Sequence, residues 1–213
     1  MLHALLAGML LMSSSTYAQN VRTVERVDLD RYLGEWHEVA RFPNRFQDQC
    51  AGDVVATYSR RDDGRIDVVN RCRLADGTAD EAAGVARVVD VTTNAKLKVR
   101  FAPAWLSWLP MVWGDYWIIG LADDYSWATI GSPDRQYLWI LSRTRELDAP
   151  RLEAAREAAR ANGFDLGRLV MTAARPSRSA TAAQAMTSGA RARVRTDVQT
   201  TSTAYFDIIL MEL

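Results

Sequence analysis

The chain has 213 residues and a formal net charge of zero, with 26 Lys and Arg against 26 Asp and Glu. This balance gives no indication of a polyanionic partner such as a nucleic acid. Hydrophobic residues make up 48% of the chain, which is typical of a globular protein with a substantial core, and the length suits one sizeable domain with extensions.

Residues 1–18 have the pattern of a secretory signal peptide. An apolar run over residues 5–12 is followed by small polar residues and by the cleavage-like sequence Thr16-Tyr17-Ala18. The apolar run is too short to span a bilayer. A signal peptide usually has a Lys or Arg before its apolar run, and this one has none, so a buried N-terminal helix is the alternative interpretation. No cysteine lies at the cleavage point to carry a lipid anchor. We therefore expect an exported protein in the periplasm, either free there or peripheral at the outer membrane.

Cysteine and histidine are scarce. Cys50 and Cys72 are the two cysteines, and an oxidising compartment favours a disulfide between them. If the signal peptide is removed with His3, His37 is the one histidine left. This excludes a metal centre with several histidines, and it allows a Ser-His-Asp triad only through His37. We expect neither a metal nor a cofactor.

Segments with strand character recur from residue 34, with turn residues between them. The Asp-Gly in "RDDG", between two β-rich runs, is a strong hairpin signal. No helix interrupts the series, which predicts an all-β antiparallel meander that forms either a sandwich or a barrel. The eight expected strands cover residues 34–42, 53–60, 65–72, 83–91, 96–101, 115–121, 125–131 and 136–142.

One helix is predicted after the last of these strands, at about residues 149–162. Asp148 suits its N-cap, Pro150 its first turn and Gly163 its end. A short apolar run at 164–171 is long enough for a ninth strand. The domain is expected to span residues 19–172, because from about residue 173 the composition shifts to Ala, Ser, Thr and Arg. This shift predicts a disordered tail over 173–213.

Three short motifs lie in order along this series of elements. Gly34-Glu35-Trp36 forms a Gly-x-Trp motif in the first strand, Asp124-Tyr125 lies between the sixth and seventh strands, and Arg143 follows "YLWILS". Over roughly residues 28–172 the chain resembles the lipocalin family, and in particular its bacterial group of outer-membrane lipoproteins and the related apolipoprotein D-like proteins. The resemblance implies an eight-stranded antiparallel up-and-down β-barrel with one C-terminal α-helix packed on it.

The resemblance also implies structural roles for Gly34, Trp36, Asp124, Tyr125 and Arg143. In the family the Trp closes the narrow end of the barrel, and the Arg lies across its ring in a cation–π contact and donates to backbone carbonyls. Glycine lets the chain turn into the barrel. The open mouth is then expected at the connections 43–52, 74–82, 102–114 and 132–135, with Cys50 and Cys72 near it.

An eight-stranded barrel is filled by side chains or holds one small ligand, so a solid core is the alternative to a cavity. The inward-facing residues mix small and aromatic side chains, which favours a cavity for a fatty acid, a lysophospholipid or a similar lipid. No cation is among them, so we expect tyrosine hydroxyls, or Arg41 and Arg45 near the mouth, to meet a carboxylate. Alternation and the family's inward phase predict this lining: Ala56, Tyr58, Val68, Asn70, Val99, Phe101, Tyr116, Ile118, Tyr137 and Trp139.

The connection at 102–114 is rich in large apolar residues, with Trp105, Trp108 and Trp113 among them. One interpretation is a lid folded over the cavity. The other is an anchor for peripheral membrane contact, because tryptophan prefers the headgroup region of a bilayer.

The function predicted from these features is non-catalytic binding and transport or storage of a small hydrophobic ligand in the cell envelope. One alternative is a lipid-modifying enzyme that uses Cys50 or Cys72 as a thiolate, or Glu38 with His37. Neighbouring residues of a strand face opposite ways, which argues against that pair. A further alternative is an interaction protein that acts through the Trp-rich connection or through the apolar last ten residues.

Overall fold

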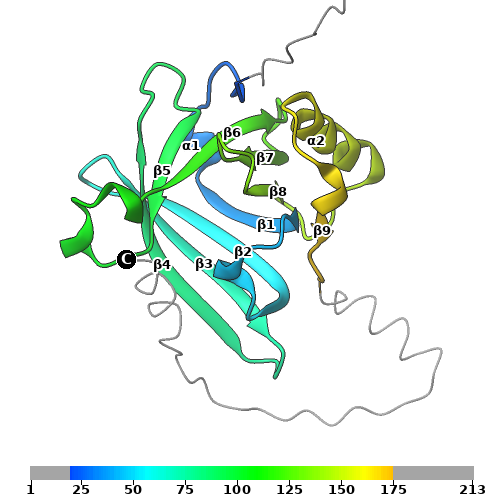
Figure 1. Cartoon of the computed structure of the whole chain (residues 1–213), viewed down its shortest axis with the longest axis horizontal. Helices are drawn as coiled ribbons and strands as arrows, with labels where there is room; N and C mark the ends of the chain where they lie inside the picture. Colours follow the sequence, from blue (N-terminus) through cyan, green and yellow to red (C-terminus); the bar gives the residue numbers. More distant parts are fainter. Residues whose placement is uncertain (1–19, 175–213) are drawn as a thin grey trace, which may run out of the picture.

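The computed structural model describes residues 20–174, which form one antiparallel sheet closed into a barrel (Figure 1). The strand order is β2-β3-β4-β5-β6-β7-β8-β1-β9, and an additional β2–β1 pairing closes the barrel. The eight-stranded antiparallel barrel expected from the sequence is thereby confirmed. The predicted signal peptide (1–18) lies outside the described residues, and so does the predicted tail (173–213) except for its first two residues.

The barrel strands follow one another in the chain, with a short helix before them and a longer one after them (Figure 1). The strands are β1 (Gly34–Arg41), β2 (Cys50–Arg60), β3 (Ile66–Leu74), β4 (Ala79–Val88), β5 (Lys96–Arg100), β6 (Gly114–Leu121), β7 (Trp127–Gly131), β8 (Leu138–Ser142) and β9 (Val170–Met171). The α-helices are α1 (Leu29–Tyr32) and α2 (Ala149–Ala161), and the 3₁₀ turns are η1 (Arg45–Gln47), η2 (Ala104–Leu106), η3 (Pro110–Val112) and η4 (Leu166–Arg168).

Several strand boundaries differ from the sequence prediction, among them the starts of β2, β4 and β7. Strands β2 and β4 begin earlier than expected, because the hairpins around β3 continue to the pairs Cys50↔Leu74 and Ala79↔Arg73. Register shifts at the start of β2 accommodate these extra residues. Strand β7 begins at Trp127 rather than at residue 125, because Tyr125 has a left-handed backbone with φ of 60° and belongs to the turn.

Helix α2 packs on the outer wall of the barrel (Figure 1). Its N-cap Asp148 accepts a hydrogen bond of 2.9 Å from the backbone N–H of Arg151. The small buried residues Ala155 and Ala159 let the helix approach β6–β8, and Thr129 Oγ1 donates to the Ala155 carbonyl at 2.9 Å. The apolar run at 164–171 contributes only the two residues of β9, which pair with β1, because η4 takes up the preceding positions.

The narrow end of the barrel is closed by Trp36, which is fully buried. The Cζ atom of Arg143 lies 3.8 Å from the centroid of the Trp36 ring, a close cation–π contact. Arg143 Nη1 donates to the Glu35 carbonyl at 2.7 Å, and Nη2 donates to the Arg31 carbonyl at 2.6 Å. Gly34 has a φ of 93°, and a Cβ there would lie 3.5 Å from Arg143 Nη1, so glycine suits both the turn and the close approach.

The second motif, Asp124-Tyr125, holds α1 against the closed end of the barrel. The Tyr125 hydroxyl accepts a hydrogen bond of 2.8 Å from the Asp28 N–H, and the Arg31 guanidinium lies 4.0 Å from the Tyr125 ring centroid. Asp124 stabilises the turn itself by accepting from the Ser126 N–H at 2.9 Å. Residues from three distant segments therefore meet at the closed end.

Replacing Arg143 by Ala is expected to lower the free energy of unfolding by about 3 kcal/mol, because the cation–π contact and the hydrogen bonds to carbonyls are lost together. Chemical denaturation measures the change. Arg145→Ala is the matched control, since Arg145 makes an exposed ion pair with Asp53 and should change stability little. Lost ligand binding at unchanged stability in Arg143→Ala would contradict a structural role for this residue.

Candidate ligand-binding site

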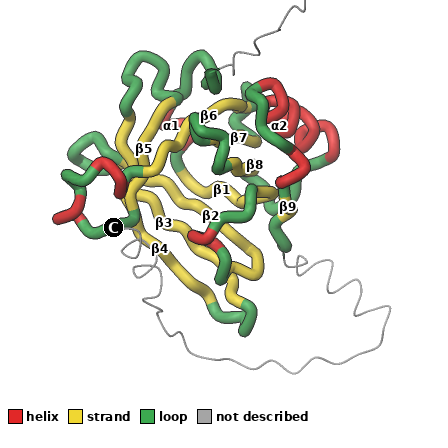
Figure 2. Tube along the Cα trace, viewed as in Figure 1, coloured by secondary structure: helices red, strands yellow, loops and turns green. Residues whose placement is uncertain are grey.

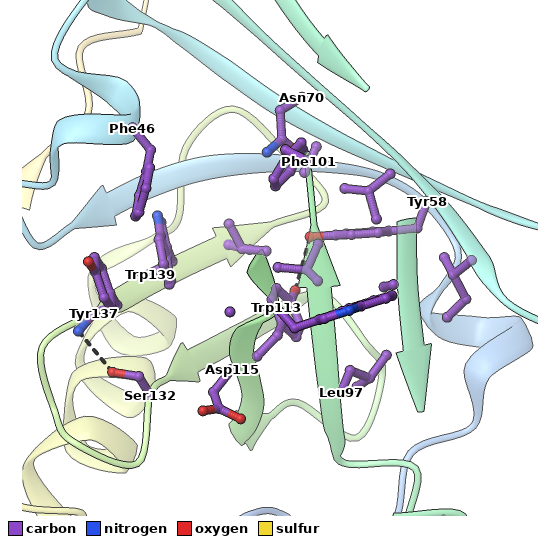
Figure 3. A pocket seen from close by; sticks show the side chains of 18 of the residues that line it. Phe46, Tyr58, Asn70, Leu97, Phe101, Trp113, Asp115, Ser132, Tyr137 and Trp139 are labelled. Carbon is purple, nitrogen blue, oxygen red and sulfur yellow. Dashed lines mark hydrogen bonds between the residues drawn. The ribbon is translucent and has the colours of Figure 1, made fainter. Parts of the chain in front are cut away.

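The barrel interior contains a cavity of about 920 Å³. Its lining runs from buried residues at the closed end, such as Tyr32, to exposed residues such as Met111 and Asp134 at the opposite end, so the cavity reaches the surface. Figure 3 shows Phe46, Tyr137 and Trp139 grouped at one side of the space and Tyr58 and Leu97 at the other. A cavity of this size is within the range of sites that enclose a small molecule.

The strands place nearly all of the predicted lining residues on the cavity wall. Register explains the agreement, because Ala56 pairs with Asn70 and Tyr58 with Val68 on neighbouring strands, so that each pair shares a face. Nine of the ten lie on the wall, namely Ala56, Tyr58, Val68, Asn70, Val99, Phe101, Tyr116, Tyr137 and Trp139. That these residues contact a ligand stays a prediction.

Ile118 is the exception, and its placement on the wall is corrected. Its side chain is fully buried, and it packs in the core cluster that also contains Trp36. Alternation along β6 gives Ile118 the same face as Tyr116, but it lies nearer the closed end, where side chains fill the interior.

The floor of the cavity carries a group of three tyrosine hydroxyls. The Tyr116 hydroxyl lies 2.7 Å from that of Tyr32 and 3.1 Å from that of Tyr58. Burial raises the pKa of Tyr58 to about 12 and raises the pKa values of Tyr32 and Tyr116 well above the usual value of a phenol. All three therefore remain neutral hydrogen-bonding groups at neutral pH.

The mouth is lined by aromatic rings. The Tyr137 and Trp139 rings are stacked, with centroids 5.8 Å apart and an interplanar angle of 7°, and the Phe46 ring lies 5.6 Å from Tyr137. Gln47, at the end of η1, fixes this group by accepting from Trp139 Nε1 at 2.9 Å. The connection before β2 therefore supplies part of the wall.

The buried carboxylate of Glu38 also faces the cavity, but its hydrogen bonds are made within the wall. It accepts from Arg41 Nη1 at 2.8 Å, from Gln47 Nε2 at 2.7 Å and from the Thr172 hydroxyl. Arg41 is thus paired with Glu38 and is not among the lining residues, and neither is Arg45. The expectation that these two arginines meet a ligand carboxylate is therefore not supported by their positions.

The charged residues of the cavity wall are all acidic. Within residues 20–174, no Lys, Arg or His lines the cavity, whereas Glu38, Asp115 and Asp134 do. Asp115 pairs with Lys98 at 3.0 Å, and Asp134 accepts from the Ser132 hydroxyl at 2.5 Å. Most of the remaining wall is apolar or aromatic, so burial of hydrocarbon is the main source of affinity that this wall offers.

Cys50 and Cys72 form a disulfide, as predicted. It joins the start of β2 to β3 and so fastens the connection that precedes β2 to the barrel wall. Neither cysteine is available as a thiolate.

His37 and Glu38 point to opposite faces of β1. Glu38 lies on the cavity wall, whereas His37 does not, and burial together with the nearby Arg145 lowers the pKa of His37. The arrangement provides no acid–base pair from these two residues.

The Trp-rich connection between β5 and β6 has a small core of its own. Ala102, Leu106, Val112 and Trp113 pack together, and Figure 2 shows the short helical turns of this segment projecting away from the strands. Trp105 and Trp108 are 70% and 75% exposed and are not among the residues that line the cavity.

Trp113 differs from the other two tryptophans of this connection, because it is buried and lies on the cavity wall. The Arg87 guanidinium lies 4.3 Å from its ring centroid, and Trp113 Nε1 donates to the Ser107 carbonyl at 2.8 Å. Trp113 therefore supports the predicted lid or membrane-contact segment from within.

Some residues of the site were not found from the sequence. Tyr32 and Leu29 lie on α1, before the first predicted strand, and Phe46 and Gln47 lie on η1 in a connection. A signal for α1 exists, because Asp28 is a good N-cap and accepts from the Asp30 N–H at 3.0 Å. Nothing in the sequence pattern indicates that η1 turns inward.

Two further properties bear on the class of site. In the described part of the chain no group of three or more His, Cys, Asp or Glu side chains is arranged to hold a metal ion. No helix there has the length and apolar character needed to cross a membrane. The fold and the site thus define a small antiparallel barrel around an apolar, solvent-connected cavity.

Comparison with known proteins identifies the family. The model of the lipocalin-like domain matches residues 27–174. The chain is 38% identical to temperature-induced lipocalin-1 of Arabidopsis thaliana over 159 residues, which cover 74% of this chain and 84% of that protein. It is 37% identical to the outer membrane lipoprotein Blc of Escherichia coli K12 over 159 residues, covering 74% and 85% of the two chains.

Among solved structures, insecticyanin from the tobacco hornworm Manduca sexta aligns with a TM-score of 0.58 at 21% identity, over 77% of this chain and 88% of that one. This similarity supports the fold. The protein belongs to the lipocalin family, as its three motifs predicted.

Proposed function

We propose that the protein binds a fatty acid, a lysophospholipid or a similar lipid in its barrel and transports or stores it without chemical change. The observation that carries this proposal is the cavity of about 920 Å³, which is lined mostly by apolar and aromatic side chains and reaches the surface at one end. Each methylene group transferred from water into such a cavity contributes about 0.8 kcal/mol, so a long chain gains affinity without any reacting group.

The candidate catalytic groups support a non-catalytic role. Both cysteines are consumed in the disulfide, and the Glu38 carboxylate is held by wall residues while His37 faces elsewhere. We therefore favour a carrier over a lipid-modifying enzyme.

The proposed place of action is the cell envelope. Residues 1–18 have the pattern of an export signal, and a relative at 37% identity is named as an outer membrane lipoprotein. The oxidised cysteine pair is compatible with the periplasm, because disulfides persist in oxidising compartments.

We also propose that the connection between β5 and β6 contacts a membrane surface. Trp105, Trp108 and Met111 are about 70% exposed, in a segment that has a small hydrophobic cluster of its own, and large exposed apolar side chains are costly to leave in water. Met111 is at the same time part of the cavity wall, so a lipid that leaves the membrane at this segment is already at the mouth. Tryptophan is the residue type that prefers the headgroup region.

Binding is tested by titrating the purified protein with a fluorescent polyene fatty acid and displacing the probe with hexadecanoic acid or a palmitoyl lysophospholipid. We expect one site per chain. Ala56→Trp should weaken binding by roughly tenfold or more, since excluding only two methylene groups from the cavity costs about 1.6 kcal/mol. Thr57→Trp is the matched control, because the next residue of β2 faces out of the barrel. Saturable binding that is unchanged in Ala56→Trp would show that the ligand lies elsewhere.

Membrane contact is tested by flotation with phospholipid vesicles. The double variant Trp105→Ser and Trp108→Ser is expected to lose most of the vesicle-bound fraction while it keeps its ligand affinity, since neither residue lines the cavity. Val91→Ser is the control, because Val91 is 81% exposed in the turn after β4, outside this segment. Equal flotation of the wild type and the double variant would rule out this segment as the contact.

A further inference from the structure

The three tyrosine hydroxyls at the floor of the cavity come from separate parts of the chain. Tyr32 is on α1, Tyr58 on β2 and Tyr116 on β6, and their oxygens lie 2.7 Å and 3.1 Å apart along the series Tyr32, Tyr116, Tyr58. All three residues line the cavity. The fold thus brings three polar atoms together where the barrel interior is otherwise closed by apolar side chains.

A count of donors shows that this group is incomplete. Each hydroxyl has one proton to donate, and the two oxygen–oxygen contacts use two of the three protons, whichever oxygen is the donor in each. No other hydrogen-bond acceptor contacts these hydroxyls within residues 20–174. One O–H group therefore remains to be satisfied at the cavity floor, and an unmade hydrogen bond in an apolar surrounding is costly.

The surroundings determine what kind of group can satisfy it. The neighbouring wall at this end is apolar and includes Leu29, Leu33, Ile66 and Leu97. No cation lines the cavity within the described residues, and burying an ionised carboxylate without a partner is strongly unfavourable. Because burial keeps the phenols protonated, the group offers a hydrogen-bond donor rather than a charge.

The position of the donor is fixed by the closed end. The Tyr32 carbonyl accepts from Trp36 Nε1 at 2.8 Å and from Arg143 Nη2 at 3.2 Å, and the Tyr32 and Trp36 ring centroids lie 5.0 Å apart. The Tyr58 ring lies 5.9 Å from that of Tyr32. A preorganised donor of this kind recognises an acceptor with little ordering cost.

We infer that the Tyr32–Tyr58–Tyr116 group is a subsite for an uncharged oxygen on the buried end of the ligand, so that the cavity accepts long-chain lipids with a hydroxyl, carbonyl or epoxide oxygen remote from the headgroup. This inference rests on the proposed function, because it assumes that a lipid chain enters the barrel. An entirely apolar floor would instead discriminate against such an oxygen.

The test compares hexadecanoic acid with 16-hydroxyhexadecanoic acid by isothermal titration calorimetry. The two probes share the headgroup and the chain length, so the ratio of their dissociation constants reports on the terminal oxygen alone. In the wild type we expect the hydroxylated acid to bind within roughly threefold of the plain acid or more tightly, since the tyrosine group compensates for the desolvation of its hydroxyl. A preference of tenfold or more for the plain acid would overturn the inference.

The variant that removes the subsite is the triple change Tyr32→Phe, Tyr58→Phe and Tyr116→Phe, because any one remaining hydroxyl still offers a donor. Replacing all partners of a polar cluster by apolar groups of the same shape is nearly neutral for stability, so the variant is expected to fold. Relative to the wild type, it should shift the ratio of the two dissociation constants by a factor of roughly ten in favour of hexadecanoic acid.

Tyr137→Phe is the matched control, since it removes a hydroxyl from the same cavity at the mouth and should leave the ratio unchanged. A ratio that is the same in the wild type and the triple variant would overturn the subsite while leaving the proposed function intact. Failure of the wild type to bind either acid would overturn both.

Discussion

The contact between the Arg143 guanidinium and the face of Trp36 holds together the parts of the chain on which the rest of the structure depends. Trp36 belongs to β1, and Arg143 follows β8 directly, so their contact joins the first and last strands of the barrel. Both side chains also donate to the Tyr32 carbonyl, which adds α1 to the junction. A closed barrel has no free strand edges, and this junction reinforces the closure at one end.

With one end closed in this way, the interior does not have to be filled along its whole length. The side chains that line a cavity lack dispersion contacts on one side. The core around Trp36 and the two clusters between the barrel and α2 offset this loss with packing contacts of their own. At the other end the disulfide and the Gln47–Trp139 hydrogen bond fix the rim. The same residues that make the fold stable therefore leave space for a guest molecule and set the polarity of its floor and mouth.

Much of this arrangement could be predicted from the sequence, because it follows from local patterns. Alternation and turn residues gave the strands, and the motif residues Gly34, Trp36 and Arg143 predicted the closed end. Alternation defines the face on which a side chain lies but not how deep in the barrel it lies, which is why alternation alone predicts Ile118 on the cavity wall.

The other differences depend on contacts between distant segments. Trp113 is buried because Arg87, on β4, covers its ring, while the neighbouring Trp105 and Trp108 have no such cover and remain exposed. The group of three tyrosine hydroxyls at the cavity floor includes Tyr32, which lies on a helix before the barrel. Only the folded chain brings Tyr32 to Tyr116. The most direct measurement of the central claim is native mass spectrometry of freshly purified protein, alone and after incubation with a palmitoyl lysophospholipid. A population carrying one non-covalent lipid per chain is the predicted result, and the mass of the unliganded chain alone under both conditions would contradict it.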